Sequence, residues 1–267
     1  IAAVVAAPAA FADVSISGNV IAEFVDDQMF TNNDLKIKST EDLGNGLKAT
    51  ANYQLQNDDG NDNTSDFSVT LSGDFGAISM GRMEGFDEGV FAAFSNIDAA
   101  HDTDLEGVFD GGQSVHTRDE RIKYVSPSFN GLKVGVTAQD DGDDKFADTE
   151  YMVSYSANGL SVAAGQSSEG TVESTNFNVK YKMGDLEVRA ATRNVDVNGA
   201  ETDANFLGAK YKMGANTIGL GMVDGDNGDA NIISVQHSFS KKTSVYAVVL
   251  DEDGGDSTTV LGLAQKF

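Results

Sequence analysis

The stretch LKATANYQLQ, residues 47–56, decides the fold because its side chains change character at every step. One set is apolar and the other polar, the two being Leu47, Ala49, Ala51, Tyr53 and Leu55 against Lys48, Thr50, Asn52, Gln54 and Gln56. Successive side chains of a β-strand point to opposite faces, so this period of two predicts a strand with one apolar and one polar face.

The same alternation recurs along the chain in sixteen segments, and no useful length shows helical periodicity. The segments lie near residues 13–25, 33–40, 47–56, 66–73, 76–82, 119–126, 131–139, 148–156, 159–167, 171–182, 185–195, 202–212, 216–223, 230–239, 243–251 and 257–267. Many have the length of a tilted strand that crosses a bilayer, about nine to eleven residues. An open twisted sheet rarely exceeds about ten strands, so we expect a closed barrel.

The connections between these segments are of two kinds that alternate. Short ones such as SANG and KMGD are followed by longer, acidic ones such as NDDGNDNTSD and VDGDNGDAN. Successive connections of a meander fall at opposite ends, so one end is tight and the other anionic. This asymmetry is typical of outer-membrane barrels. The predicted fold class is therefore an all-β, transmembrane, antiparallel up-and-down β-barrel of about 16 strands.

Two stretches repeat each other weakly, NVKYKMGDLEV at 178–188 and GAKYKMGANTI at 208–218. Each carries Lys-Tyr-Lys-Met followed by glycine. Two copies indicate repeated hairpins, because a solenoid would need at least about three stacked units.

The composition excludes several classes of function. The formal net charge is −24, with 18 Lys and Arg against 42 Asp and Glu, which argues against nucleic acid as a partner. The chain has no Cys, so disulfides, thiolate catalysis and Cys metal sites are absent. His101, His116 and His237 lack metal-site spacing, and no GxSxG motif occurs. We expect no metal, no cofactor and no enzymatic activity.

The first segment, IAAVVAAPAAFA at residues 1–12, is apolar but shorter than the roughly 20 residues of a spanning helix. It is typical of the end of a secretory signal, with Ala10-Phe11-Ala12 as a small-x-small cleavage site. We interpret residues 1–12 as the remnant of a cleaved signal peptide and residues 13–267 as a single barrel domain. An ordinary N-terminal helix is the alternative. Export of a barrel predicts the bacterial outer membrane and its lipid as the surroundings.

The last segment, STTVLGLAQKF at residues 257–267, places Leu261, Leu263 and Phe267 on one face. A strand that closes a barrel against the first strand cannot fray, and rings are favoured at the membrane interface. A final strand ending in Phe is similar to the C-terminal signal of outer-membrane proteins. That similarity implies recognition by the machinery that inserts barrels.

Several blocks carry a narrower resemblance, among them DVSISGNV (13–20), STEDLGNGLKATANYQLQ (39–56), ISMGRMEG (78–85), RIKYVSPSFNGLKVGV (121–136) and HSFSKKTSVYAVV (237–249). Together they resemble the general diffusion porins of Gram-negative bacteria, from Asp13 to Phe267. The resemblance implies a sixteen-stranded barrel, usually a homotrimer, that passes small hydrophilic solutes passively.

The one long connection, residues 83–117, is the candidate for narrowing the channel, because loops beyond about 12–15 residues are usually functional or disordered. The resemblance implies that it folds inward as a constriction loop, with Asp104, Glu106 and Asp110 as its acidic residues. It also implies a basic wall opposite the loop. Alternation directs inward Lys36, Lys38, Lys48, Arg121 and Lys123. Arg82 stands where the family has a wall arginine, but its parity with Ile78 and Met80 would aim it outward, so this role requires a bend.

These features predict an outer-membrane porin with a modest preference for cations, because carboxylates predominate in the loops and the basic wall offsets them only in part. For each wall lysine the alternative is a solvated charge far from the narrowest point. For the whole chain the alternative is a surface barrel that acts in adhesion or recognition, with a narrow or plugged channel. A soluble acidic β-sandwich is a third interpretation.

Overall fold

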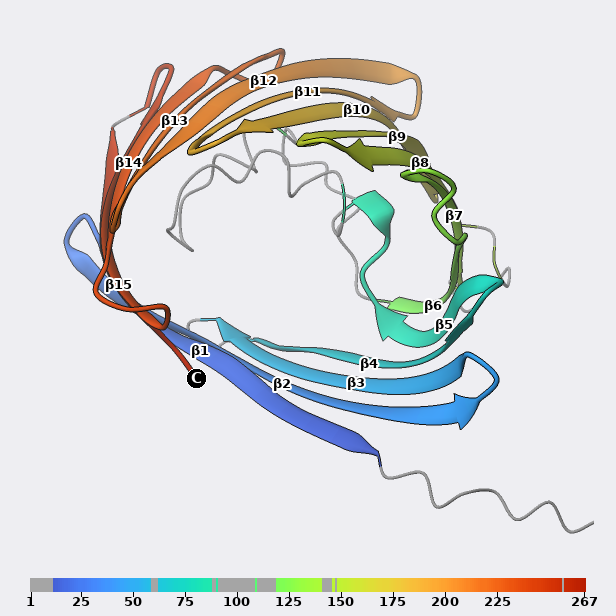
Figure 1. Ribbon diagram of the computed structural model, residues 1–267. Helices are drawn as coiled ribbons and strands as arrows, with labels where there is room; N and C mark the ends of the chain where they lie inside the picture. The colour runs from blue at the N-terminus through green and yellow to red at the C-terminus, as the bar shows by residue number, and fades with distance from the viewer. Residues whose placement is uncertain are drawn as a thin grey trace, which may run out of the picture.

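The computed structural model describes residues 12–58, 62–87, 90, 109, 119–140, 146, 148–255 and 257–267. The strands close into one antiparallel ring, in which each strand pairs with its neighbours in sequence and β1 pairs with β16 (Figure 1). The sixteen-stranded β-barrel predicted above is confirmed. Of the predicted signal remnant, residues 1–11 lie outside the described residues.

The strands are β1 (Asp13–Val25), β2 (Gln28–Gly44), β3 (Leu47–Asp58), β4 (Asp62–Gly73), β5 (Gly76–Met83), β6 (Asp119–Val125), β7 (Leu132–Gln139), β8 (Asp148–Ala157), β9 (Leu160–Glu169), β10 (Val172–Met183), β11 (Leu186–Val197), β12 (Ala200–Met213), β13 (Asn216–Gly225), β14 (Ala230–Ser238), β15 (Thr243–Glu252) and β16 (Thr258–Lys266). No helix in the described part of the chain is long and apolar enough to cross a membrane.

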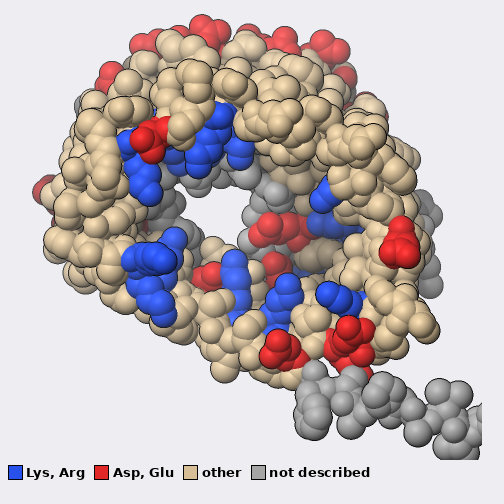
Figure 2. Space-filling view, in the orientation of Figure 1, with Lys and Arg blue, Asp and Glu red and all other residues tan. Residues whose placement is uncertain are grey.

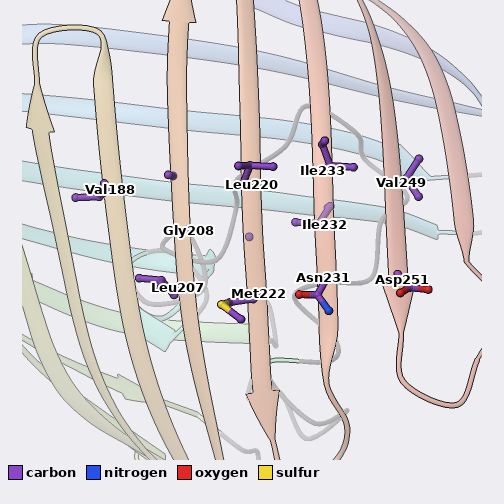
Figure 3. Close-up of a pocket in the computed structure, with 12 residues that line it drawn as sticks. Val188, Leu207, Gly208, Leu220, Met222, Asn231, Ile232, Ile233, Val249 and Asp251 are labelled. Carbon is purple, nitrogen blue, oxygen red and sulfur yellow. The ribbon is translucent and has the colours of Figure 1, made fainter.

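The outer face of the barrel is apolar. Residues directly opposite one another on paired strands point to the same face, so each apolar row continues across the sheet. Figure 3 shows part of this face on β12–β15, where Leu207, Leu220, Ile233 and Val249 lie around a shallow groove of about 580 Å³. These side chains are about half exposed. In water they would be a liability, whereas a lipid bilayer covers them.

Aromatic side chains gather beside the short turns at one end of the barrel. The exposed ones are Phe75, Phe129, Tyr155, Tyr181, Tyr211, Phe239 and Phe267. Rings of this kind concentrate where the apolar band of a barrel meets the membrane interface. The short turns suit this end, since Asn45-Gly46 and Asn158-Gly159 adopt the positive φ angles that two-residue hairpins require.

The connections at the other end are shorter than the acidic stretches predicted. β1 ends at Val25 and β2 begins at Gln28, so only two residues of VDDQMFTN form the connection. β13 runs to Gly225 and β14 begins at Ala230. The expectation of long loops here was wrong because polar residues such as Asn32, Asn33 and Asp34 interrupt the alternation within β2 while their backbones stay paired with β1. Backbone pairing continues there although the hydrophobic alternation has stopped.

The interior is not uniformly polar. An apolar cluster lies on the inner face of β12–β16, formed by Phe206, Val223, Ile232, Val248, Leu250 and Val260. Phe109, from the long connection between β5 and β6, joins this cluster. Its ring lies 6.3 Å from the ring of Phe206, edge to face. The long connection therefore reaches the inner wall at this residue.

The barrel closes where β16 meets β1. Tyr246 of β15 lies across Gly262 and donates a hydrogen bond from its hydroxyl to Glu23 of β1. A Cβ at Gly262 would lie 2.1 Å from the tyrosine ring, so only glycine leaves room for this contact. Nearby, Phe267 exchanges backbone hydrogen bonds with Gly18, and its ring covers that glycine. The Tyr246 side chain thus links β15, β16 and β1 across the closing seam.

Candidate functional site

More than half of the 18 Lys and Arg residues point into the barrel. Strand register places on the inner face Lys36, Lys38, Lys48, Arg121, Lys123, Lys133, Lys180, Lys182, Arg189, Arg193, Lys210, Lys212 and Lys266. Figure 2 shows an opening through the molecule, with Lys and Arg side chains around it. Many of the visible Asp and Glu side chains lie on the outer rim. The inner wall is therefore rich in cations although the whole chain is acidic.

Arg82 is not on this wall. It lies opposite Phe67 on the outer face and shares a groove with Ile37, Tyr53 and Met80. The bend that a wall role requires does not occur, because β5 keeps its alternation through to Met83. Glu120 stands directly across from Arg82 on β6, on the same outer face. The prediction that Arg82 belongs to the basic wall was wrong.

Arg121 and Lys123 face inward, but they hold the start of the long connection, Lys123 directly and Arg121 through Glu150, instead of lining open water. The Arg121 guanidinium lies 2.6 Å from a carboxylate oxygen of Glu150, and both side chains are almost wholly buried. The other oxygen of Glu150 accepts hydrogen bonds from the backbone N–H groups of Phe86 and Asp87. Lys123 donates to the backbone carbonyl oxygens of Glu84 and Gly85. Both cations therefore help to hold residues 84–87, the loop base of the long connection.

A second buried group holds the same segment to β10 and β11. Asp87 accepts hydrogen bonds from Ser174 at 3.0 Å, from Asn176 at 2.8 Å and from Arg193 at 2.8 Å. The Asp87 side chain is fully buried, and that of Arg193 is 1 % exposed. A buried carboxylate is stable only when it is paired and hydrogen-bonded in this way. The connection is thus pinned against the wall at its first residues.

The loop base lies close against the inner wall because small residues make room for it. Phe86 packs on Gly135 of β7, where an added Cβ would lie 2.4 Å from its ring. Gly85 lies against the Glu150 carboxylate, which leaves no space for a side chain there. Together with Asp87 and Phe109, these contacts confirm the predicted inward fold for the described residues of the connection. Asp104, Glu106 and Asp110 lie outside the described residues.

The three remaining predicted lysines lie on β2 and β3. Lys36, whose side chain is about half exposed, forms an ion pair with the mostly buried Asp34 at 3.3 Å and borders an inner cavity of about 260 Å³. The rest of the lining is polar and comprises Asn19, Asn32, Asn33, Gln54, Gln56 and Glu84. Lys38 and Lys48 share the inner face with Asn52 and Ser72 respectively. Amide and charged groups at this wall suit hydrated solutes, because they replace hydrogen bonds that a solute loses on leaving water.

Sequence reasoning missed Asp87, Glu150 and Arg193. The inward direction of Glu150 and Arg193 could be inferred from the sequence, since both fall on the polar rows of alternating strands. Their partners were not readable, because each pair joins segments far apart in the chain. At the seam, Leu261 and Leu263 face outward and Phe267 contacts β1, which is where the predicted insertion signal lies.

An apolar exterior, a cation-rich interior and an inward loop base define a class of protein: a β-barrel that encloses a channel across the outer membrane. Residues 1–257 match the model of the Gram-negative porin family, and the chain belongs to that family. The family and its relatives place it in the bacterial outer membrane.

Individual relatives agree with this assignment. The chain is 26 % identical over 285 residues to outer membrane porin protein 32 of Delftia acidovorans, covering 87 % of this chain and 77 % of the relative. An anion-selective porin from Comamonas acidovorans has a TM-score of 0.70 and 20 % identity, over 96 % of this chain and 100 % of that chain. The trimer form of OmpT from Vibrio cholerae has a TM-score of 0.73 and 17 % identity, over 96 % and 99 %. The last two likenesses show the fold alone.

Proposed function

We propose that this porin is a passive channel for small hydrophilic solutes and that it has no enzymatic activity. The observation that carries the proposal is the pairing of an apolar outer face with an inner wall of Lys, Arg, Asn and Gln around an opening (Figure 2). A hydrated solute finds hydrogen-bond partners on such a wall, whereas an apolar solute gains nothing there. Fixed loop-base contacts would then keep the long connection from leaving the lumen.

Liposome swelling tests this proposal. Liposomes that contain the purified protein should swell in neutral sugars, at a rate that falls as the sugar grows larger. A folded barrel that admits no sugar of any size would contradict the proposal and favour a plugged surface barrel. Heat-shifted mobility on a gel serves as the control that the barrel in the liposomes is folded.

We further propose that the channel prefers anions, in place of the modest cation preference expected from the acidic loops. Cations on the inner wall face the lumen along several strands, whereas carboxylates of the described connections, such as Asp226 and Asp253, lie at the barrel end. Fixed charges act over a screening length of only about 10 Å at 0.1 M salt, so those that line the lumen weigh most on a passing ion. The anion-selective porin from Comamonas acidovorans shares the fold, which supports the same sign. Gluconate should therefore enter the liposomes faster than protonated glucosamine, which has a similar size. The reverse order would contradict the preference.

The proposed assembly is a homotrimer, supported by the placement of Arg82 and by the trimeric OmpT relative. Arg82 and Glu120 lie on the outer face among Tyr53, Phe67 and Met80, where lipid would otherwise be the surroundings. An arginine that faces lipid costs about 2–4 kcal/mol near the middle of the bilayer. Contact with another copy of the chain would remove this cost by supplying polar partners.

The charge-reversing change Arg82→Glu tests the trimer. It places a second carboxylate beside that of Glu120, so the trimer band on an unheated gel should collapse at a lower temperature than wild type. Thr192→Glu is the control, because Thr192 lies on the outer face of β11, away from this groove. If Arg82→Glu trimers survive to the wild-type temperature, the face that carries Arg82 does not form the interface.

A further inference from the structure

Five of the inward cations form one group on β10, β11 and β12, beside the short turns. They come from the repeated Lys-Tyr-Lys-Met stretches: Lys180, Lys182, Lys210 and Lys212, with Arg189 on the strand between. In each stretch both lysines point inward, while Tyr181 and Tyr211 are exposed on the outer face. The repeat therefore builds the same arrangement twice, and β11 lies between the two copies.

Strand register places four of these side chains in two adjacent rows, and Lys212 lies two positions beyond Lys210 on β12, opposite Thr217. One row runs from Lys180 to Arg189, which lies directly across from it. The next row runs from Lys182 to Glu187 and on to Lys210. Cβ atoms directly opposite on paired strands are about 4.5–5.5 Å apart, so the ammonium groups share a small area of wall.

The neighbouring positions leave space over the group. Arg189 faces Gly208 and Lys210 faces Gly219, and Gly208 in turn faces Gly221. These three inward positions carry no side chain, so the long basic side chains meet no bulky group on that side. Lys182 and Lys212 are exposed, and Lys180 and Lys210 are half-buried. The amines of Lys182 and Lys212 are therefore open to water in the channel mouth.

Among the residues that the structure describes, the group has more cationic than acidic side chains. Among its described members Glu187 is the one carboxylate, and it pairs with Arg189 at 2.7 Å and 2.8 Å. That pair fixes the guanidinium, and the four lysines of the group surround this one described carboxylate. Arg121 and Arg193 differ from these five cations because each is buried in an ion pair. Arg121 pairs with Glu150 of the wall, and Arg193 pairs with Asp87 of the loop base.

We propose that Lys180, Lys182, Lys210, Lys212 and Arg189 form a binding site for small multivalent oxyanions, such as inorganic phosphate, at the short-turn mouth of the channel. Each ammonium offers three N–H donors and a compact charge, which suits an oxyanion with several acceptor oxygens. The ligand is a free solute rather than a lipid headgroup, because the group faces the lumen. This inference rests on the proposed function, since the solute reaches the wall through an open channel.

Phosphate block of chloride current tests the site. Channels in a planar bilayer carry chloride, and added phosphate should lower the current at concentrations at which monovalent nitrate does not. The variant Lys182→Gln/Lys212→Gln removes two charges from the exposed edge of the group. Screened Coulomb attraction of a divalent ion over about 7 Å then predicts that the half-blocking phosphate concentration rises roughly fivefold to tenfold.

The matched control is Lys241→Gln/Lys242→Gln, which removes two lysines from the turn between β14 and β15 at the same end of the barrel. It should leave the half-blocking concentration unchanged. A second variant, Lys180→Gln/Lys210→Gln, should give a shift like the first if the group acts together. Equal block by phosphate and nitrate, or equal shifts in variant and control, would overturn the site while chloride current upholds the channel. A folded protein that carries no chloride current would refute the channel itself, and the site with it.

Discussion

Removal of the Arg193 charge should release the base of the long connection. Asp87 is fully buried, and Arg193 is its one cationic partner among the described contacts, with Ser174 and Asn176 as neutral donors. Breaking a buried ion pair by removing one partner costs about 3–5 kcal/mol. Because about 1.4 kcal/mol corresponds to a factor of ten, Arg193→Gln should raise the population of detached loop base at least about a hundredfold.

Single-channel recording measures this change. The wild-type channel should give a steady open current, whereas Arg193→Gln should give larger current fluctuations as the loop base leaves and returns. The double variant Asp87→Asn/Arg193→Gln removes both charges, so no carboxylate is left buried and uncompensated, and the fluctuations should fall back toward wild type. Asn194→Ala is the control. Asn194 is the residue after Arg193 in β11, and its partly exposed side chain donates a hydrogen bond to Asp203. Wild-type noise in a folded Arg193→Gln channel would refute the role assigned to this pair.

Three further outcomes follow from the seam and the wall. Gly262→Ala should lower the unfolding free energy by about 1–3 kcal/mol through overpacking against Tyr246, which a lower urea midpoint would show. The control Gly255→Ala, whose Cβ would make only ordinary contacts, should not lower the midpoint. Equal midpoints for the two variants would count against the seam contact. Phe267→Ala should reduce the yield of heat-modifiable barrel in cells, because the ring that covers Gly18 is lost; an unchanged yield would remove Phe267 from the insertion signal. Raising KCl from 0.1 M to 1 M should weaken the ion preference, since the screening length falls from about 10 Å to about 3 Å; a preference independent of salt would exclude fixed wall charges as its cause.

The strand count and the facing of most side chains could be predicted from the sequence, because the period of two is local. β3 illustrates this, with Tyr53 outside and Gln54 inside as the alternation requires. Strand ends were less predictable, since β2 extends back to Gln28 beyond Asn32, Asn33 and Asp34, which interrupt the hydrophobic alternation. Hydrophobic alternation reports the membrane-embedded part of a strand and not the full length of its hydrogen-bonded ladder.

The roles of wall residues depended on contacts that no local pattern encodes. Arg121 and Arg82 were both assigned to the basic wall, yet one is buried against Glu150 and the other faces outward. For Arg82 the parity argument was correct and the family resemblance misled. For Arg121 the parity was correct, but its partner lies 29 positions along the chain and became visible only in the fold.

The central claim is that cations on the inner wall, more than carboxylates in the loops, set the electric field in the channel. The reversal potential of a bilayer that contains the channel and separates 0.1 M from 1 M KCl measures that field most directly. The screening lengths on the two sides are about 10 Å and 3 Å. We predict a potential whose sign shows that chloride crosses more readily than potassium. A potential of the opposite sign would contradict the account.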